Sequence, residues 1–241
     1  MTNPVSPTGP LGLIVPPAKG EVPSDAGILY PGTEFIARGL ALPTVTPAGY
    51  DQVIDAVVRV ARELAEAGAV AISLMGTSLS FYRGVDFNQE LQRSMAEASG
   101  RPCTTMSQAV LRGLETLGLR RVVVATAYID DVNQRLATFL RDSGYAVDRA
   151  EGLEMTDIAA IQAVDTETLV ALCERVWRSS PEAEGIVLSC GGLKTLDTIV
   201  EVERRLGVPV VSSPPAGVWD LMRTAGRDAR VDGRGALLGR A

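Results

Sequence analysis

Cys190 is the residue of this chain best suited to chemistry. It follows the apolar run Ile186–Leu188 and precedes two glycines, so a short strand ends in a thiol on a backbone that permits close ligand approach. The chain contains no histidine, which makes cysteine the best remaining group for proton transfer near neutral pH. Ligands of open α/β sheets bind at the carboxyl ends of strands. A small buried residue packed at a strand end is an equally good interpretation of this cysteine alone.

Two further loops could donate hydrogen bonds to an anion. Gly76, Thr77 and Ser78 follow the apolar stretch Val70–Leu74, and the two adjacent hydroxyls could bind a carboxylate or an enolate oxygen. Tyr128 follows another apolar stretch and could donate from its phenol. The structural alternatives are a helix N-cap or turn for the hydroxyl pair and a packing aromatic for the tyrosine.

The elements that must position these residues alternate between short apolar runs and longer helical stretches. This pattern is typical of βαβ units with a mostly parallel sheet, and Val and Ile dominate strands whose two faces are both covered by helices. The predicted strands are Leu11–Val15, Val70–Leu74, Val122–Ala125, Ile186–Leu188 and Val208–Val211. The predicted helices are Gly49–Ala67, Phe87–Ser99, Ser107–Leu117, Asp131–Ser143, Thr166–Arg178 and Leu193–Leu206. The last of these helices would place its N-terminal N–H groups beside Cys190.

The chain also repeats itself, which predicts two similar α/β lobes facing each other. Gly100–Ala109 aligns with Gly207–Ala216, and in each half an apolar strand with an unusual loop comes before the repeat. We expect a first lobe over residues 1–117, completed by an irregular C-terminal tail at residues 226–241. The second lobe would occupy residues 118–225.

The composition predicts a globular protein without a polyanionic partner. Hydrophobic residues make up 46% of the 241 residues and charged residues 22%, the usual balance of a soluble domain. A formal net charge of −6 and 5% aromatic residues argue against binding nucleic acid or an anionic membrane. No apolar stretch is long enough to span a bilayer, and Leu11–Val15 is too short for a signal-peptide core. We therefore expect a cytoplasmic protein.

The cysteines and the missing motifs narrow the chemistry further. The three cysteines form no CxxC pair, which argues against a disulfide framework and a zinc site, and the lack of histidine argues against most transition metals. Cys173 falls on the apolar face of a predicted helix and Cys103 in a strand-like stretch, so both favour structural roles. No Walker lysine loop and no GxGxxG follow the first strand. The catalytic options are thiol, carboxylate, tyrosine, lysine and oriented backbone amides.

Three sequence strings, taken in order, resemble a known family. They are MGTSLSFYRG at Met75–Gly84, ATAYIDDVN at Ala125–Asn133 and LSCGGL at Leu188–Leu193. From about Leu11 to about Met222 the chain closely resembles the bacterial arylmalonate decarboxylases of the aspartate/glutamate racemase superfamily. The resemblance implies two pseudo-symmetric α/β lobes with the active site in the cleft between them. It also implies cofactor-free decarboxylation of α-aryl and α-alkyl-α-aryl malonates, small dicarboxylates, to optically pure α-aryl carboxylic acids.

The resemblance assigns a role to each candidate residue. Thr77, Ser78, Tyr128 and the backbone N–H groups of Cys190 and Gly191 would hold the surviving carboxylate as it becomes an enediolate. Cys190 would then protonate the carbanionic carbon on one face. The departing carboxylate would occupy an apolar pocket, for which the matching residues are Pro16, Leu42, Val45, Ile158 and Ile161. This agrees with the chemistry, because without a cofactor the electron pair left on carbon must be stabilised by preorganised donors.

Gly76 distinguishes between reaction types. Racemases of the superfamily carry one thiol on each side of the cleft, so the glycine at this position predicts that only one face receives a proton. A racemase or cis–trans isomerase is the first alternative, and it would need a second thiol, with Cys103 as the candidate. The second alternative is a non-enzymatic carboxylate-binding protein that keeps the donors but turns nothing over. For the oligomeric state, a monomer is the working hypothesis.

Overall fold

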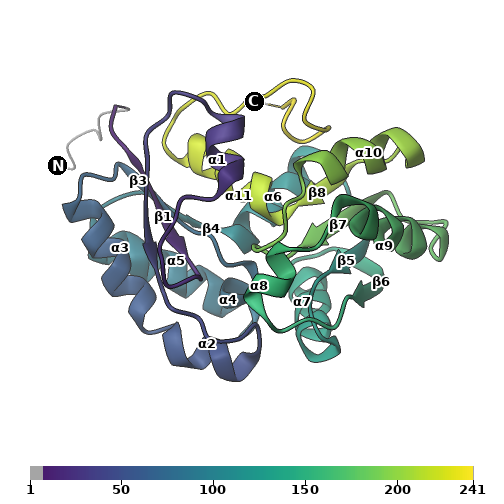
Figure 1. Cartoon of the computed structure of the whole chain (residues 1–241), viewed down its shortest axis with the longest axis horizontal. Helices are drawn as coiled ribbons and strands as arrows, with labels where there is room; N and C mark the ends of the chain where they lie inside the picture. The colour runs from purple at the N-terminus through teal and green to yellow at the C-terminus, as the bar shows by residue number, and fades with distance from the viewer. Residues whose placement is uncertain (1–7, 241) are drawn as a thin grey trace.

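Two parallel sheets with the same strand order form the framework of the molecule (Figure 1). The computed structural model describes residues 8–240; residues 1–7 and 241, which the expected lobe boundaries include, lie outside the described residues. The first sheet has the order β2-β1-β3-β4, with β1 (Leu11–Val15), β2 (Phe35–Gly39), β3 (Ala71–Leu74) and β4 (Cys103–Thr105). The second has the order β6-β5-β7-β8, with β5 (Arg121–Thr126), β6 (Ala146–Gly152), β7 (Gly185–Ser189) and β8 (Val210–Ser212). The predicted fold class is confirmed.

Helices cover the outer faces of the sheets and also fill the space between them. Those of the first half are α1 (Ser24–Leu29), α2 (Pro47–Val53), α3 (Ala56–Glu66), α4 (Thr77–Phe81), α5 (Val85–Ser99) and α6 (Met106–Thr116). Those of the second half are α7 (Asp130–Asp142), α8 (Ile158–Gln162), α9 (Thr166–Arg178), α10 (Leu196–Leu206) and α11 (Ser213–Thr224). α3 packs with α5 against the first sheet, and α9 packs with α10 against the second. α6 and α11 pack on each other and contact strands of both sheets, so they join the two halves.

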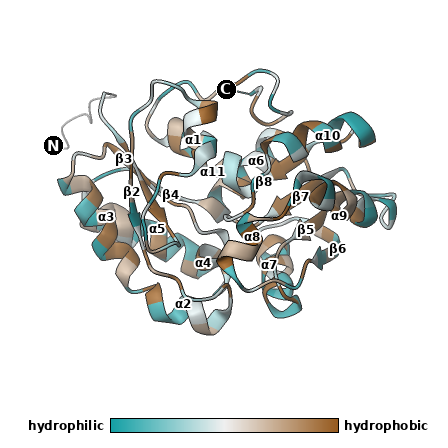
Figure 2. Cartoon of the chain, viewed as in Figure 1, coloured by the Kyte–Doolittle hydropathy of each residue, from teal (hydrophilic) through white to brown (hydrophobic). Residues whose placement is uncertain are grey.

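The central strands are buried because both of their faces meet helices. Every residue of β1, β3 and β7 is buried, and the amphipathic helices turn their apolar sides towards these strands (Figure 2). On α3 the buried side consists of Val57, Val60, Ala61 and Leu64. The core of each half therefore lies between its sheet and its helices.

The elements that differ from prediction lie mostly at sheet edges. β2 and β6 were not expected, because FIARG and AVDRAEG carry charged residues that an edge strand can leave in solvent. The predicted helix Gly49–Ala67 is wrong as one element: the chain turns at Ile54, whose carbonyl accepts from the Val57 N–H, and continues as a second helix. The predicted helix at Leu193 begins instead at Leu196.

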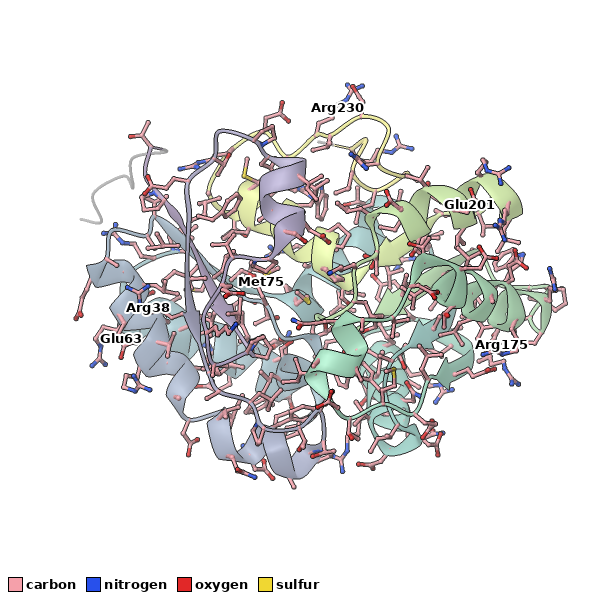
Figure 3. The ribbon with its side chains drawn as sticks, in the orientation of Figure 1. Arg38, Glu63, Met75, Arg175, Glu201 and Arg230 are labelled. Atoms are coloured by element: carbon pink, nitrogen blue, oxygen red, sulfur yellow. The ribbon has the colours of Figure 1, made fainter. Side chains whose placement is uncertain are left out.

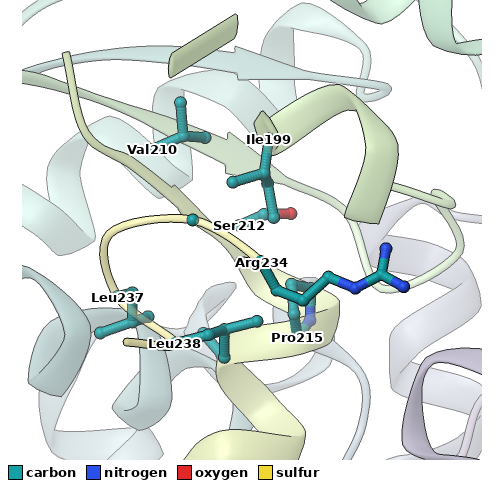
Figure 4. A pocket seen from close by; sticks show the side chains of 9 residues that line it. Ile199, Val210, Ser212, Pro215, Arg234, Leu237 and Leu238 are labelled. Carbon is teal, nitrogen blue, oxygen red and sulfur yellow. The ribbon is translucent and has the colours of Figure 1, made fainter. Parts of the chain in front are cut away.

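The C-terminal segment, residues 226–240, contains no helix or strand and contacts both halves of the molecule. The Tyr30 hydroxyl donates to the Ala229 carbonyl at 2.7 Å, and the Ala236 N–H donates to Glu203 on α10 at 2.9 Å. Figure 4 shows Leu237 and Leu238 closing a void against Ile199 and Val210. The void has a volume of about 10 Å³, room for at most one water molecule. No helix in the part of the chain that the structure describes is long and apolar enough to cross a membrane.

Candidate active site

A cavity of about 620 Å³ opens where residues that follow strands of both sheets come together. This volume is in the usual range for small-molecule sites. Every predicted site residue except Tyr128 lines it. The lining predicted residues are Pro16, Leu42, Val45, Gly76, Thr77, Ser78, Ile158, Ile161, Cys190 and Gly191. Met75, which follows β3 and is labelled near the centre of Figure 3, also belongs to the wall.

The loop after β3 is held rigidly by buried hydroxyls. Gly76 is the N-cap of α4, and Thr77 and Ser78 form the first turn of that helix. Ser107, at the start of α6, donates from its hydroxyl to the Thr77 carbonyl at 3.0 Å and lies 2.7 Å from the hydroxyl of Ser80. Ser80 in turn donates to the Thr77 carbonyl at 2.9 Å. These bonds fix the backbone of two residues that line the cavity, and the Thr77 hydroxyl donates to the Met106 sulfur at 2.9 Å.

Tyr128 is fully buried behind the cavity wall, and its hydroxyl has no hydrogen-bond partner. Burial raises its pKa well above the ordinary value, with nearby Cys190 and Tyr50 acting in the same direction, so the phenol keeps its proton. The hydroxyls of Ser189 and Thr77 are close enough to oppose that shift. Buried polar groups without a partner are rare in folded proteins, so this hydroxyl can serve a ligand.

The backbone of Tyr128 is fixed by a small polar network at the end of β5. Its N–H donates to the Thr126 hydroxyl oxygen at 3.0 Å, and that hydroxyl donates to Asn133 at 2.6 Å. The Asn133 amide donates back to the Tyr128 carbonyl at 3.3 Å. The ring packs edge-on against Phe81, with 5.9 Å between ring centroids. The aromatic packing role and the free hydroxyl therefore occur in the same residue.

Cys190 lies directly after β7, with 4% of its surface exposed. Burial raises its pKa to about 11, while the N–H groups of Gly192 and Leu193 and the hydroxyl of Tyr128 act in the opposite direction. The residue lies in a turn closed by the Leu193 N–H, which donates to its carbonyl at 3.2 Å. The expected position at a helix N terminus is wrong, because α10 begins only at Leu196. N–H groups of the turn, rather than of the helix, face the sulfur, which is a neutral thiol at neutral pH.

Close contacts favour glycine at the two positions after the thiol. A Cβ atom at Gly191 would lie 2.9 Å from the Met75 carbonyl oxygen, and one at Gly192 would lie 3.1 Å from a methyl carbon of Ile161. The first of these contacts joins the loop after β7 to the loop after β3. The two halves of the site therefore touch through their backbones.

Apolar side chains from both halves form another part of the cavity wall. Leu42, Val45 and Ile161 are buried, while Pro16 and Ile158 are half-buried. The Leu42 N–H donates to the Pro16 carbonyl at 2.9 Å. The Val45 N–H donates to the Thr156 carbonyl at 3.0 Å, which ties this loop to the segment before α8. The wall can desolvate a group that enters it.

Tyr50 is a residue that sequence reasoning missed. It lies on α2 with its ring buried and its hydroxyl without a hydrogen-bond partner. Burial raises its pKa above the ordinary value, the nearby Ser78 hydroxyl opposes this, and Cys190 adds to it. Nothing in the sequence around Tyr50 separates it from the other apolar positions of a helix. Only the fold shows a second unpaired phenol near the thiol.

The other cysteines lie away from the cavity. The Cys103 sulfur lies 3.4 Å from the Arg101 carbonyl and 3.5 Å from the Ser99 hydroxyl, and Cys173 is buried in α9. Of the cysteines within residues 8–240, only Cys190 lines the cavity. The same residues contain no group of three His, Cys, Asp or Glu side chains placed to hold a metal ion.

Comparisons with known proteins agree on one family. The arylmalonate decarboxylase family model matches residues 11–238. The chain is 59% identical over 224 residues to the arylmalonate decarboxylase of Bordetella bronchiseptica, covering 93% of each protein. It superposes with a TM-score of 0.94 on a double mutant of arylmalonate decarboxylase in the liganded form, at 57% identity over 95% of this chain and 98% of that one.

A more distant relative shares the fold. The maleate isomerase Iso from Pseudomonas putida S16 superposes with a TM-score of 0.88 at 22% identity, covering 95% of this chain and 98% of that one. The two-sheet architecture is therefore common to this chain and to the isomerase. The chain is much more similar in sequence to the arylmalonate decarboxylase, at 59% identity, than to the isomerase, at 22%. The predicted resemblance is confirmed: this chain belongs to the arylmalonate decarboxylase family.

Proposed function

We propose that the chain decarboxylates α-aryl malonates to α-aryl carboxylic acids without a cofactor, with Cys190 as the proton donor. The observation that carries the proposal is a buried thiol, with a pKa of about 11, close to the unpaired phenol of Tyr128. The acid thus lines the cavity, and an unpaired hydrogen-bond donor lies behind its wall. The family to which the chain belongs supports the same reaction.

In the proposed reaction, the bond between the α-carbon and one carboxylate breaks, and CO2 leaves. The electron pair of that bond moves into the remaining carboxylate, which becomes an enediolate. The hydroxyls of Thr77, Ser78 and Tyr128 and the N–H groups of Cys190 and Gly191 hold its two oxygens. Removing one such preorganised donor typically costs about 100- to 1000-fold in rate.

The proton then moves from the Cys190 thiol to the α-carbon, and the thiolate regains a proton from water. Each turnover therefore consumes one proton. A thiol that holds its proton weakly would be ionised before the carbanion forms, so the raised pKa of Cys190 suits this role. The enediolate is a strong carbon base and can accept the proton from a thiol of this kind.

The apolar wall, with Leu42, Val45 and Ile161, would receive the departing carboxylate. Excluding water from that group destabilises its charge and favours neutral CO2. Half of the dicarboxylate would thus meet donors, while the other half meets hydrocarbon. This asymmetry would select which of two chemically equal carboxylates leaves.

Replacing Cys190 tests the proposal. With phenylmalonate under chelation, Cys190→Ala should lose about 100- to 10,000-fold in CO2 release, the usual contribution of a general acid. Substrate binding measured by calorimetry should stay within about threefold, because the hydroxyl donors remain. Cys103→Ala is the matched control, since that thiol lies outside the cavity, and it should keep full activity. Undiminished CO2 release by Cys190→Ala would overturn the proposal.

The same experiment separates the alternatives left open by the sequence. A racemase or isomerase would need a second thiol, and the position equivalent to Cys190 in the first half is Gly76. A carboxylate-binding protein would bind phenylmalonate without releasing CO2 in any variant. If the unmodified protein releases CO2, that possibility is excluded.

We also propose that the enzyme acts as a monomer in the cytoplasm, with lobes divided at residues 117 and 118. All the proposed groups come from one chain, and α6 and α11 join the lobes. Light scattering at assay concentrations tests the oligomeric state. The specific activity, the rate per mole of enzyme, should not depend on protein concentration. A dimer whose dilution abolishes activity would contradict this proposal.

A further inference from the structure

The two lysines of the chain both line the active-site cavity. Lys19 follows β1 and Lys194 follows β7, and the remaining cations among the 23 Lys and Arg residues are arginines. The lining contains no arginine among the described residues, so these lysines are its cationic groups. Neither residue belongs to the donors or to the apolar wall described above.

Asp25 lines the same cavity and is a buried carboxylate with an unused oxygen. It lies on α1 with 6% of its surface exposed, and Oδ2 has no hydrogen-bond partner. Burying a carboxylate in this way is costly unless another group bonds to it. Oδ2 itself is shielded from solvent, so a ligand in the cavity can satisfy it once the Asp25 side chain turns towards the cavity.

Lys194 is the cation that acts on Asp25. Burial raises the pKa of Asp25 to about 6, the charge of Lys194 opposes the rise, Asp197 adds to it, and the Ser24 hydroxyl opposes it. Within the described residues Lys194 has no carboxylate within 4.0 Å, and its side chain is exposed at the cavity. Lys19 differs, because its ammonium lies 3.9 Å from Glu21. Asp25 and Lys194 are thus a hydrogen-bond acceptor and a hydrogen-bond donor near each other, and each can bond to a further group.

The cavity has room for these groups to meet a substrate. The proposed donors and apolar wall account for the two carboxylates of a malonate, and the remaining volume must hold the α-aryl substituent. Asp25 lies beyond Pro16 along the loop that leaves β1, and Lys194 lies beyond Gly191 along the loop that leaves β7. Both residues therefore line the cavity on loops that also carry proposed site residues.

We infer that Asp25 and Lys194 form a subsite for a neutral hydroxyl group on the substrate's aryl ring. The inference rests on the proposed function. A phenolic hydroxyl can accept from the ammonium of Lys194 and, with the Asp25 side chain turned towards the cavity, donate to its carboxylate, so it satisfies both groups. A ring carboxylate would be repelled by Asp25, and a ring ammonium would be repelled by Lys194. The preferred substrates are therefore hydroxyaryl malonates.

The test compares phenylmalonate with ring-substituted phenylmalonates that carry a hydroxyl, a carboxylate or an aminomethyl group. At a pH well above the pKa of Asp25, the best hydroxyl isomer should show a kcat/KM about tenfold above phenylmalonate, the usual order for a charged hydrogen bond. Both charged analogues should fall below phenylmalonate. Asp25→Ala and Lys194→Met should each reduce the hydroxyl preference to about threefold or less. Their activity on phenylmalonate should stay within about threefold of the unmodified enzyme.

Lys19→Met is the matched control, because Lys19 lines the same cavity but faces Glu21. It should keep the tenfold preference. Asp25→Asn provides a variant of equal size in case the alanine variant does not fold, and it should also weaken the preference. Equal preference in the unmodified enzyme and both subsite variants would overturn the inference, as would a preference for either charged analogue. Failure to decarboxylate phenylmalonate at all would instead contradict the proposed function.

Discussion

Cys190 shows how burial alone can prepare a thiol for acid chemistry. Its neighbours include two turn N–H groups and a phenol that favour the thiolate, yet desolvation outweighs them and raises the pKa to about 11. Nucleophilic cysteines need the reverse arrangement, with nearby cations that lower the pKa. The site is thus suited to giving a proton to carbon rather than to attacking an electrophile.

The pKa of Cys190 predicts the alkaline limit of activity. Because the thiol is the proton donor, kcat for phenylmalonate should stay level above neutral pH and fall as the pH approaches about 11, where the thiol ionises. Circular dichroism over the same range would show whether the fold survives. A fall centred near the ordinary thiol pKa of about 8.5 would contradict the burial argument.

Gly76→Cys should introduce two-sided proton exchange. The new Cβ would lie 2.8 Å from a methyl carbon of Leu79 and 3.3 Å from a ring carbon of Pro16, so the Leu79 side chain must turn aside. We expect slower decarboxylation together with racemisation of an aryl-propionate product, followed by NMR as solvent deuterium entering the α-position. Full decarboxylation without deuterium exchange would show that the two halves are not functionally equivalent.

Asp25→Asn should stabilise the protein in a pH-dependent way. The folded pKa of about 6 lies above the ordinary 3.8, so the stability that protonated Asp25 contributes is complete below about pH 4 and lost as the pH rises through 6. Asparagine does not titrate, so the variant should gain Tm relative to the unmodified protein between these limits. Thermal melts at several pH values measure this difference. A difference that does not change with pH would contradict the assignment.

At the scale of elements, hydrogen bonds within α4 and between α4 and α6 set the position of Thr77 and Ser78. α4 has only five residues, too few to be stable alone, and it is held by Ser80 and Ser107. The sequence predicted the strand before this loop but not α4 itself, because TSLSF lacks a helical period of useful length. Edge strands were missed for a related reason, since their polar residues are tolerated only where neighbouring strands supply the pairing.

Ser107→Ala should damage activity through the position of Thr77. It removes a buried hydroxyl that donates to the Thr77 carbonyl, at a cost of about 0.5–1.5 kcal/mol in unfolding free energy, because the Ser80 hydroxyl still donates to that carbonyl. Looser positioning of Thr77 should also lower kcat/KM by about tenfold. Ser143→Ala is the control: its hydroxyl donates to the Phe139 carbonyl at 2.7 Å on α7, outside the cavity, so kcat/KM should not change. Equal effects on kcat/KM would show that Ser107 acts on general stability only.

At the scale of the whole molecule, α11 joins the two sheets. It contacts strands of both sheets, and Asp220, which is fully buried on it, accepts from Arg112 on α6 at 2.8 Å and from Thr104 on β4. Sequence reasoning predicted the two lobes from their repeat. It did not predict α11, which begins with Ser213, Pro214 and Pro215, although proline is well tolerated in the first turn of a helix.

Arg112→Met should weaken the joint between the lobes. It leaves Asp220 buried without its cation, which we expect to cost about 3 kcal/mol of unfolding free energy in urea denaturation. Arg59→Met removes an exposed pair with Glu63 and should cost about 0.5 kcal/mol or less. Adding Asp220→Leu to Arg112→Met should restore much of the loss. No recovery in the double variant would show that packing of the arginine stem, rather than its charge, is responsible.

Only part of the candidate site could be predicted from the sequence. Cys190, Thr77 and Ser78 follow predicted strands in strings that resemble a known family, and that resemblance implied that they share one cleft. Tyr50 and Asp25 lie on helices whose sequences give no sign of an unused polar atom. Whether a polar atom lacks a partner depends on the whole fold, and no local pattern encodes it.

The hydrogen atom that serves as the side chain of Gly191 allows its backbone to lie close to the Met75 carbonyl. A methyl group there would lie too close to a backbone oxygen, so one of the two loops would have to shift. A larger residue at Gly191 would therefore push the loop after β7 away from the loop after β3.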